Sequence, residues 1–287
     1  MKFFTLTKPV SFSGRTTSGF KKTTVTFIPP ARIDGWDPLY AHFGNGRPSQ
    51  IDLNSAVTRN WRFVARVGRI VSRIDGVNIS AVEHYSALRF LFPGLYLVNN
   101  SGQTPPYIPC TGALLETLFA SSREVERDVP WFTVDGAVGW QYPKPRGGIE
   151  AFTLIEPNPE RSLKICVTVK FKEIGERTER FEFPNEDRLR QVLSAPALGR
   201  PAWIETPARL LWHHAGKMFW ARRADPEHAL RMIIRHRVDD ILGAVALLPS
   251  PVKGGFPSLS LFSQCSGHLA DMNALNMLML KGKTFLL

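Results

Sequence analysis

The chain has 287 residues, of which 44% are hydrophobic and 21% charged, and this globular composition excludes disorder as the main state. Glycine and proline are numerous but follow no period, which excludes a collagen-like or low-complexity chain. The formal net charge of +11 favours anionic partners: phosphorylated metabolites, nucleic acid or an acidic membrane surface.

The first half of the chain opens with strand patterns and continues into helical ones. Runs rich in β-branched and aromatic residues predict strands at residues 23–28, 61–71 and 95–98. Apolar residues recur every three or four positions over 81–92, where Ser80 can cap the start of a helix and Pro93-Gly94 can stop it. A further helix is predicted at 112–121.

The same succession begins again after the charged stretch 122–130, which ends in proline and is typical of a linker. Strands are predicted at 151–155, 162–172 and 181–183, and helices at 186–193, 226–248 and 267–280. We therefore predict an α+β protein of two similar units, residues 1–125 and 126–287, each a β-sheet packed against helices. No sequence repeat links the two units, so the predicted similarity is one of topology.

The cysteines and the apolar runs bear on the cellular compartment. Cys110, Cys166 and Cys265 are widely separated without a CxxC pair, which excludes a zinc knuckle and is typical of a reducing compartment. The longest apolar run, 241–248, is far shorter than the roughly 18 residues of a membrane span. The N-terminal apolar run is too short for a signal peptide. We expect a cytoplasmic protein without a membrane span, while association with a membrane surface stays open.

The long predicted helix carries the first candidate for chemistry. His236 and Asp240 are four residues apart, a spacing that puts an imidazole and a carboxylate on one helical face. Such a pair can hold a metal ion, as in zinc-binding helices, or can form a surface ion pair. The adjacent His213 and His214 lack a third ligand at a suitable spacing, and we interpret them as surface or packing residues.

Two further candidates lie at the predicted starts of helices. In Glu83-His84 the histidine can bind a metal and the carboxylate can take a proton from water, although capping and solvation also explain such a dipeptide. His268 follows a glycine in Ser266-Gly267-His268, where it can act as an acid or as an anion stabiliser.

Taken together and in this order, the three blocks resemble a known family. The segment 80–88, the His236-to-Asp240 pair followed by 241–243, and 266–268 with Asn273 and Asn276 beyond it are similar to the zinc-dependent UDP-3-O-acyl-N-acetylglucosamine deacetylase family of lipid A biosynthesis. Looser similarity extends over most of the chain, including 19–31 and 162–183.

The resemblance implies a sandwich of two similar α+β domains with the active site between them. It implies that His84, His236 and Asp240 bind zinc, with an open fourth position for water or substrate. Glu83 would be the general base and His268 the general acid or the cation that stabilises the oxyanion. Arg237 stands where the family has a basic residue that can meet nucleotide phosphates.

The sequence departs from the family pattern in four places: at Ala244, at Ala197, at 17–19, where the usual His-Thr-Gly turn is missing, and at 108–111, where an aspartate is lost. Ala244 replaces an aspartate that orients the catalytic histidine, and Ala197 replaces a threonine near the reacting carbonyl. Such losses of support around a metal site commonly cost about 10–100-fold in metal affinity or activity. Cys265 is close to His268 in sequence, and its role, in packing or in modulating the site, stays open.

We expect a zinc-dependent deacetylase that removes an N-acyl group, most simply N-acetyl, from an acylated amino sugar or nucleotide sugar. Its partner would be an anionic small molecule, in keeping with the net charge of +11. The alternatives are a divergent member with another acylated substrate and a binding protein that holds zinc or ligand without turnover. A basic nucleic-acid-binding protein is a third reading, but no motif supports it and we do not expect a nucleic-acid partner. The aromatic residues Trp203, Trp212, Phe219 and Trp220 can line an acyl passage or belong to the core.

Overall fold

The structure is a computed structural model of the chain. It describes all residues except 18–19, 63–65, 75, 109–110, 143–149, 173, 199–204, 221–224 and 282–283, and no side chain of 59–62, 66–68 or 284–285. Trp203 and Cys110 therefore lie outside the described residues.

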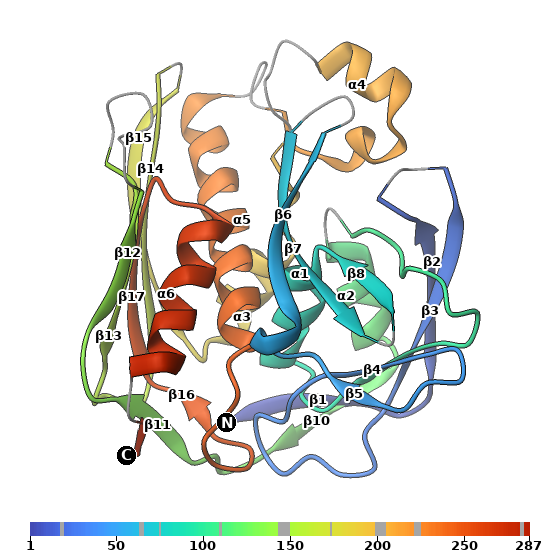
Figure 1. Cartoon of the computed structure of the whole chain (residues 1–287), viewed down its shortest axis with the longest axis horizontal. Helices are drawn as coiled ribbons and strands as arrows, with labels where there is room; N and C mark the ends of the chain where they lie inside the picture. The colour runs from blue at the N-terminus through green and yellow to red at the C-terminus, as the bar shows by residue number, and fades with distance from the viewer. Residues whose placement is uncertain are drawn as a thin grey trace.

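Two five-stranded sheets form the outer layers of the molecule (Figure 1). The first has the order β2 (Val10–Arg15), β3 (Lys22–Ile28), β9 (Tyr96–Asn99), β4 (Tyr40–Phe43), β5 (Ser49–Gln50). The second has the order β12 (Val138–Gln141), β13 (Phe152–Pro157), β17 (Leu259–Gln264), β14 (Leu163–Phe171), β15 (Gly175–Phe183). Both sheets thus follow the same strand order relative to the chain.

The directions of the strands repeat as well. In each sheet the strand that comes last in the chain lies at the centre, parallel to one neighbour and antiparallel to the other: β9 between β4 and β3, and β17 between β14 and β13. A parallel pair requires a crossover, and helices of the middle layers provide it in both units. This repeated topology is the similarity of build that the sequence predicts.

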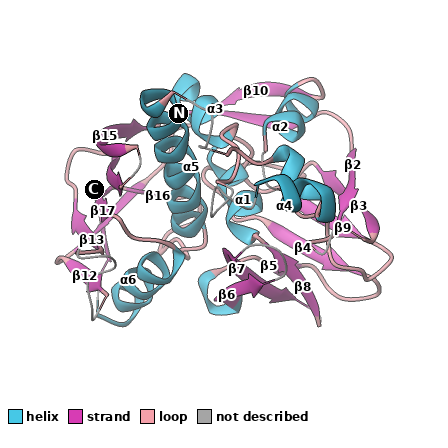
Figure 2. Cartoon of the chain, turned by 90° about the horizontal axis from the view of Figure 1, so that it is seen from above, coloured by secondary structure: helices cyan, strands magenta, loops and turns pink. Residues whose placement is uncertain are grey.

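The described helices are α1 (Val82–Ser86) with the 3-10 turn Ala87–Phe90, α2 (Gly112–Phe119), α3 (Glu186–Leu193), α4 (Glu205–Leu211) with the 3-10 turn η4 (His213–Lys217), α5 (Pro226–Ala246) and α6 (His268–Lys281). Figure 2 shows α5 and α1 between the two sheets, whereas α4 lies at one end of the molecule (Figure 1). The fold is therefore α+β, with sheets packed against helices, as predicted.

Three smaller sheets complete the structure. They are β1 (Lys2–Leu6) with β10 (Ser122–Glu126); β16 (Phe256–Pro257), β11 (Trp131–Val134) and β18 (Thr284–Leu286); and β6 (Ala56–Arg62), β7 (Arg66–Ile74) and β8 (Val77–Ser80). A 3-10 turn, Leu53–Ser55, precedes β6.

Local sequence explains the best-formed elements. The carboxylate of Asp225 accepts the backbone N–H of His228 at 2.8 Å, and Pro226 occupies the first turn, which starts α5 where the pattern predicts it. In β14 the alternate residues 163, 165, 167 and 169 are buried, which places one face of the sheet against the helices. One continuous hydrophobic core contains residues of both halves, so the division at residue 125 stays a prediction.

Three local predictions were wrong, and one predicted strand was too short. The expected strand 61–71 is a hairpin, because β6 ends at Arg62 and β7 begins at Arg66. Residues 122–126 of the expected linker form strand β10, which pairs with β1. Its side chains are mostly charged and exposed, so the sequence pattern does not indicate a strand. The strand predicted at 181–183 is confirmed, but it is the end of the longer β15, which begins at Gly175. Ser80 does not cap α1; Ala81 precedes the helix in the left-handed conformation, with φ of 56°.

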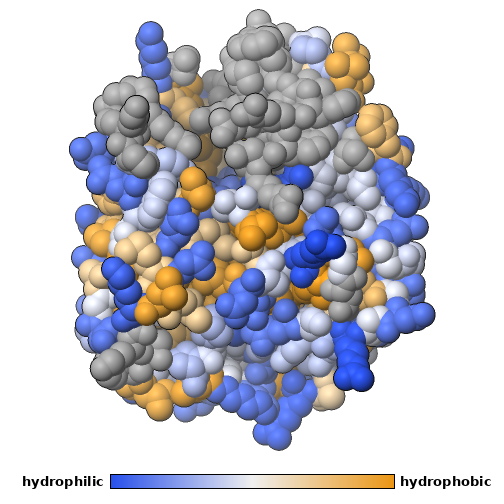
Figure 3. All heavy atoms as spheres, in the orientation of Figure 1, coloured by the Kyte–Doolittle hydropathy of each residue, from blue (hydrophilic) through white to orange (hydrophobic). Residues whose placement is uncertain are grey.

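No helix among the described residues is long and apolar enough to cross a membrane. Figure 3 shows a surface on which hydrophilic side chains surround patches of hydrophobic ones.

Candidate metal centre

The close crossing of α1 and α5 places the candidate residues side by side. A Cβ atom at Gly243 would lie 2.1 Å from the carbonyl oxygen of Glu83, so only glycine allows the two backbones to meet there. The hydroxyl of Ser86 donates to the carbonyl of Gly243 at 2.7 Å and holds the crossing together. As a consequence, Glu83 and His84 of α1 face His236 and Asp240 of α5.

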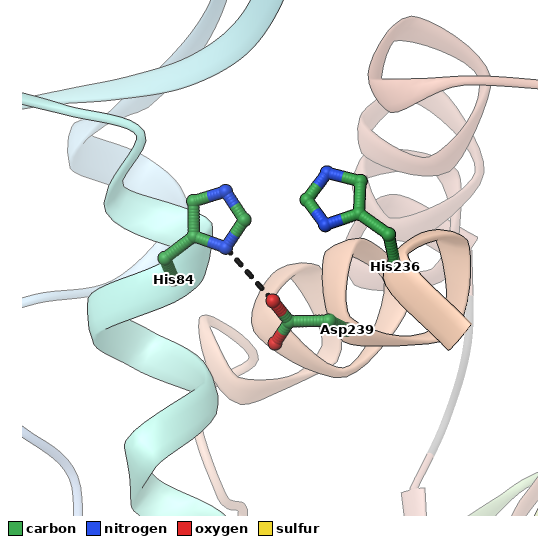
Figure 4. A group of neighbouring side chains, drawn as sticks. All are labelled: His84, His236 and Asp239. Carbon is green, nitrogen blue, oxygen red and sulfur yellow. Dashed lines mark hydrogen bonds and ion pairs between the residues drawn. The ribbon is translucent and has the colours of Figure 1, made fainter. Parts of the chain in front are cut away.

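His84, His236 and Asp239 lie close together at the centre of the site (Figure 4), and Asp240 lies beside them. His84 Nδ1 lies 2.8 Å from Asp239 Oδ2, and the rings of His84 and His236 are 5.2 Å apart. His236 Nε2 lies 3.5 Å from Asp240 Oδ1. Two groups of three residues each have potential ligand atoms within 4.8 Å of one another: His84 with His236 and Asp239, and Glu83 with His84 and Asp240. The expected ligands His84, His236 and Asp240 are thus divided between two overlapping groups.

The donor atoms of these residues could hold a metal ion. Asp240 Oδ1 and Asp239 Oδ1 are buried and have no hydrogen-bond partner within the described part of the chain, an arrangement that a cation would satisfy. The Nδ1 atom of His236 contacts the carbonyl oxygen of Ala195 at 3.3 Å, and that of His84 contacts Asp239. Both imidazoles therefore keep Nε2 for a ligand, and nitrogen with carboxylate oxygen is a set that zinc accepts.

Glu83 and His268 lie beside these groups. The backbone N–H of Ile70 donates to Glu83 Oε2 at 3.0 Å, while Glu83 Oε1 lies 3.7 Å from His268 Nε2. His268 Nε2 is also 3.8 Å from Asp240 Oδ2. Burial, and then the neighbouring Asp240 carboxylate, raise the pKa of Glu83 well above its usual range. Burial lowers the pKa of His268.

The resemblance implies an aspartate at position 244 that would orient the ring of His268 through Nδ1, and this chain has Ala244 there. Nδ1 of His268 is buried and has no hydrogen-bond partner among the residues that the structure describes. Ala244 is itself completely buried and carries no polar group. This geometry is in keeping with the absence of an aspartate to orient the ring.

Arg237 is buried at the edge of the same cavity. Its Nη2 atom donates to Ser263, Ser266 and Asp271, with the Asp271 carboxylate oxygen 2.5 Å away. Nε and Nη1 have no hydrogen-bond partner in the described structure. The carboxylate of Asp271 neutralises most of the charge of the Arg237 guanidinium. The N–H groups of Nε and Nη1 are still available as hydrogen-bond donors to a ligand.

A cavity of about 330 Å³ connects these groups. Besides the residues above, its walls include Tyr107, Ala197, Met218, Lys170 and Cys265. A larger hollow of about 650 Å³ lies against β14, β15 and β17 and contains none of the candidate residues. The structure thus brings together every site residue that the sequence predicts: Glu83, His84, Ala197, His236, Arg237, Asp240 and His268.

Sequence reasoning missed Asp239 and Asp271. Asp239 precedes a predicted ligand, and Asp271 lies one turn after His268, so position in a helix was the only available signal. Trp212 and Trp220 are buried in a second, small hydrophobic cluster with Tyr107, Ala197 and Met218, which supports the packing interpretation for these two tryptophans.

Comparisons with known proteins add nothing to this picture. No family model matches the sequence, and no curated protein matches it.

Proposed function

We propose that the protein is a zinc-dependent amidohydrolase that removes an N-acyl group, most simply N-acetyl, from an acylated amino sugar or nucleotide sugar in the cytoplasm. The observation that carries the proposal is that Glu83, His84, His236, Asp240 and His268 line one cavity. They come from three helices, α1 in the first half of the chain and α5 and α6 in the second. The ordered resemblance to the deacetylase family of lipid A biosynthesis points to the same chemistry.

The side chains can divide the proton transfers of amide hydrolysis between them. When bound by His84, His236 and Asp240, zinc would polarise the acyl carbonyl and lower the pKa of water to about 7. The Glu83 carboxylate, held at Oε2 by the Ile70 N–H, takes a proton from the attacking water. His268 Nε2, 3.7 Å from Glu83, gives a proton to the leaving amine, so that water and amide become carboxylate and amine.

An anionic group on the substrate would meet Arg237. Its buried Nε and Nη1 lie without a hydrogen-bond partner in the described chain and belong to a side chain of the cavity wall. Guanidinium N–H groups match carboxylate and phosphate oxygens well. Ala197, also in the wall, would contact the substrate without a hydroxyl to support the oxyanion.

A second candidate function is binding without turnover. Nδ1 of His268 lacks a partner in the part of the chain described, so nothing on that side keeps the ring oriented or charged. Such a protein would hold zinc or an acylated ligand but transfer protons slowly.

Metal content and turnover of matched variants separate the two functions. We expect about one zinc per chain in the wild type by elemental analysis, and a large loss of zinc in His236→Ala. Glu83→Gln should keep zinc and lose about 100-fold or more in turnover on a panel of N-acetylated amino sugars and nucleotide sugars.

Ala244→Asp is the companion variant, because it offers His268 a carboxylate. A large gain in turnover would support a weakened hydrolase. Zinc binding without turnover in both proteins favours the binding function, whereas a wild type that neither contains nor takes up zinc contradicts both.

A further inference from the structure

One end of the molecule exposes large apolar side chains on two neighbouring segments. Leu210 and Leu211 of α4 are 81% and 62% exposed, and Phe20, before β3, is 71% exposed. Among the described large hydrophobic side chains, only Leu280 and Leu286 are comparably exposed. Figure 3 shows hydrophobic side chains over α4, at the upper right of the view. Exposed apolar side chains gathered in this way mark an interaction surface.

Hydrogen bonds fix the two segments to each other. Trp212 Nε1, directly after α4, donates to the carbonyl oxygen of Thr17 at 2.8 Å, and His214 Nε2 donates to that of Thr16 at 2.7 Å. Arg15 Nη1 donates to the carbonyl of Phe20 at 3.2 Å. Because these bonds join Trp212 and η4 to the turn after β2, the segments that carry the exposed apolar side chains are connected, and we call their common surface the platform.

The platform is strongly basic. The cationic residues of its two segments are Arg15, Lys21, Lys22, Arg209 and Lys217. The acidic residue of these segments, Glu205, is paired with Arg209 at 3.0 Å. Burial, and then the nearby Arg15 and Lys217, lower the pKa of His213, which places both cations at this end of the molecule.

We propose that this platform, formed by Phe20, Leu210 and Leu211 with the surrounding lysines and arginines, binds the surface of an anionic lipid bilayer. The apolar side chains would enter the boundary between headgroups and acyl chains, and the cations would contact the lipid phosphates. Stable attachment to a membrane surface needs two such signals, and the platform combines them. A nucleic acid would use the cations but would leave the two leucines in water, so lipid is the better partner.

The platform adjoins the catalytic cavity. Met218, immediately after η4, lines the cavity, whereas Lys217, its neighbour, is exposed. One short segment therefore connects the membrane-facing surface with the candidate site. The inference goes beyond the proposed function, because binding to a bilayer needs neither zinc nor turnover.

Sedimentation with vesicles tests the proposal. We expect the wild type to bind vesicles of phosphatidylcholine with about one third phosphatidylserine, and to bind pure phosphatidylcholine far less. Leu210→Ser/Leu211→Ser should weaken binding about tenfold or more. Lys21→Gln/Lys22→Gln should weaken it about fivefold for each charge removed.

Two controls make the result specific. Leu280→Ser removes a side chain that is 84% exposed in α6 and should leave vesicle binding unchanged. His236→Ala should also bind vesicles like the wild type, so failure of the metal site and failure of the membrane site are distinguishable.

Three outcomes would overturn the proposal. The first is a wild type that does not bind anionic vesicles. The second is equal binding by the double leucine variant. The third is vesicle binding that the lysine variant loses, that the leucine variant keeps and that nucleic acid displaces. This result would show that the surface binds polyanions in general and not lipid.

Discussion

At the scale of single residues, the orientation of two imidazole rings controls the candidate metal centre. His84 directs Nδ1 to the buried carboxylate of Asp239, and His236 directs Nδ1 to the carbonyl of Ala195. His236 Nε2 lies 3.5 Å from Asp240 Oδ1, and Nε2 of His84 stays available to a ligand in the cavity that both rings line. Carboxylate and carbonyl groups that hold the far nitrogen of a ligand histidine fix its tautomer and raise its basicity.

Replacing Asp239 tests this role. We expect Asp239→Asn to lower zinc affinity about 10–100-fold, measured by competition with a chromophoric chelator, because the charge that supports His84 is lost. Asp187→Asn, an exposed aspartate of α3, is the matched control and should not change affinity. If Asp239→Asn removed zinc completely while Asp240→Asn kept it, the ligand would be Asp239 instead of Asp240.

His214 makes stability depend on pH. Burial lowers its pKa to about 4, from an ordinary 6.5. Between these values the unfolded chain binds a proton that the folded chain does not. The stabilisation is therefore complete above pH 6.5 and is lost as the pH falls towards 4, by up to about 3 kcal/mol.

Urea unfolding at pH 7 and at pH 4.5 checks this expectation. The loss of unfolding free energy on acidification should be about 2–3 kcal/mol smaller in His214→Gln than in the wild type. The exposed His228 provides the control, since His228→Gln should lose as much as the wild type. An unchanged pH dependence in His214→Gln would show that another group is responsible.

At the scale of elements, the crossing of α1 and α5 determines whether a site exists. Glu83 and His84 come from a helix of only five residues, which by itself is too short to be stable. Its position depends on contact with the 21-residue α5 at Gly243 and Ser86. A small change at this contact would move two predicted site residues at once.

Gly243→Ala is the corresponding substitution. Its methyl group would overlap the Glu83 carbonyl, so the helices must separate, and we expect unfolding free energy to fall by about 3 kcal/mol or more. Zinc affinity should fall in parallel. Gly216→Ala is the control, because a Cβ there meets nothing within 4 Å. Equal unfolding free energies for the two variants would contradict the close crossing.

At the scale of the whole molecule, two sheets of the same topology enclose one continuous core. The candidate ligands come from both halves of the chain, with His84 in α1 and His236 and Asp240 in α5. A metal ion bound here would join the halves, and its binding energy would add to the stability of the folded state.

Removal of the metal should therefore lower thermal stability. A chelator is expected to reduce Tm of the zinc-loaded wild type, since a ligand at a thousand times its Kd stabilises by about 4 kcal/mol. The chelator should leave Tm of His236→Ala unchanged, because that variant has lost a ligand. A wild type whose Tm does not respond to chelator or to added zinc would argue against a metal between the halves.

The sequence by itself determined the α+β class, the position of α5, and the placement of His236 and Asp240 on one helical face. These features depend on local periodicity, capping and spacing, which a single segment carries within itself. The resemblance of three short blocks also brought Glu83, His84 and His268 into one predicted site, and the structure places them together.

Only the tertiary structure decided which atoms meet. The bond between His84 and Asp239 joins residues 155 positions apart, and the pairing of Arg237 with Asp271 joins α5 to α6. The sequence pattern likewise did not predict the strand β10, which forms by pairing with the distant β1. Such contacts depend on how whole elements pack, and local patterns do not carry that information, because the same exposed charge or buried carboxylate suits many arrangements.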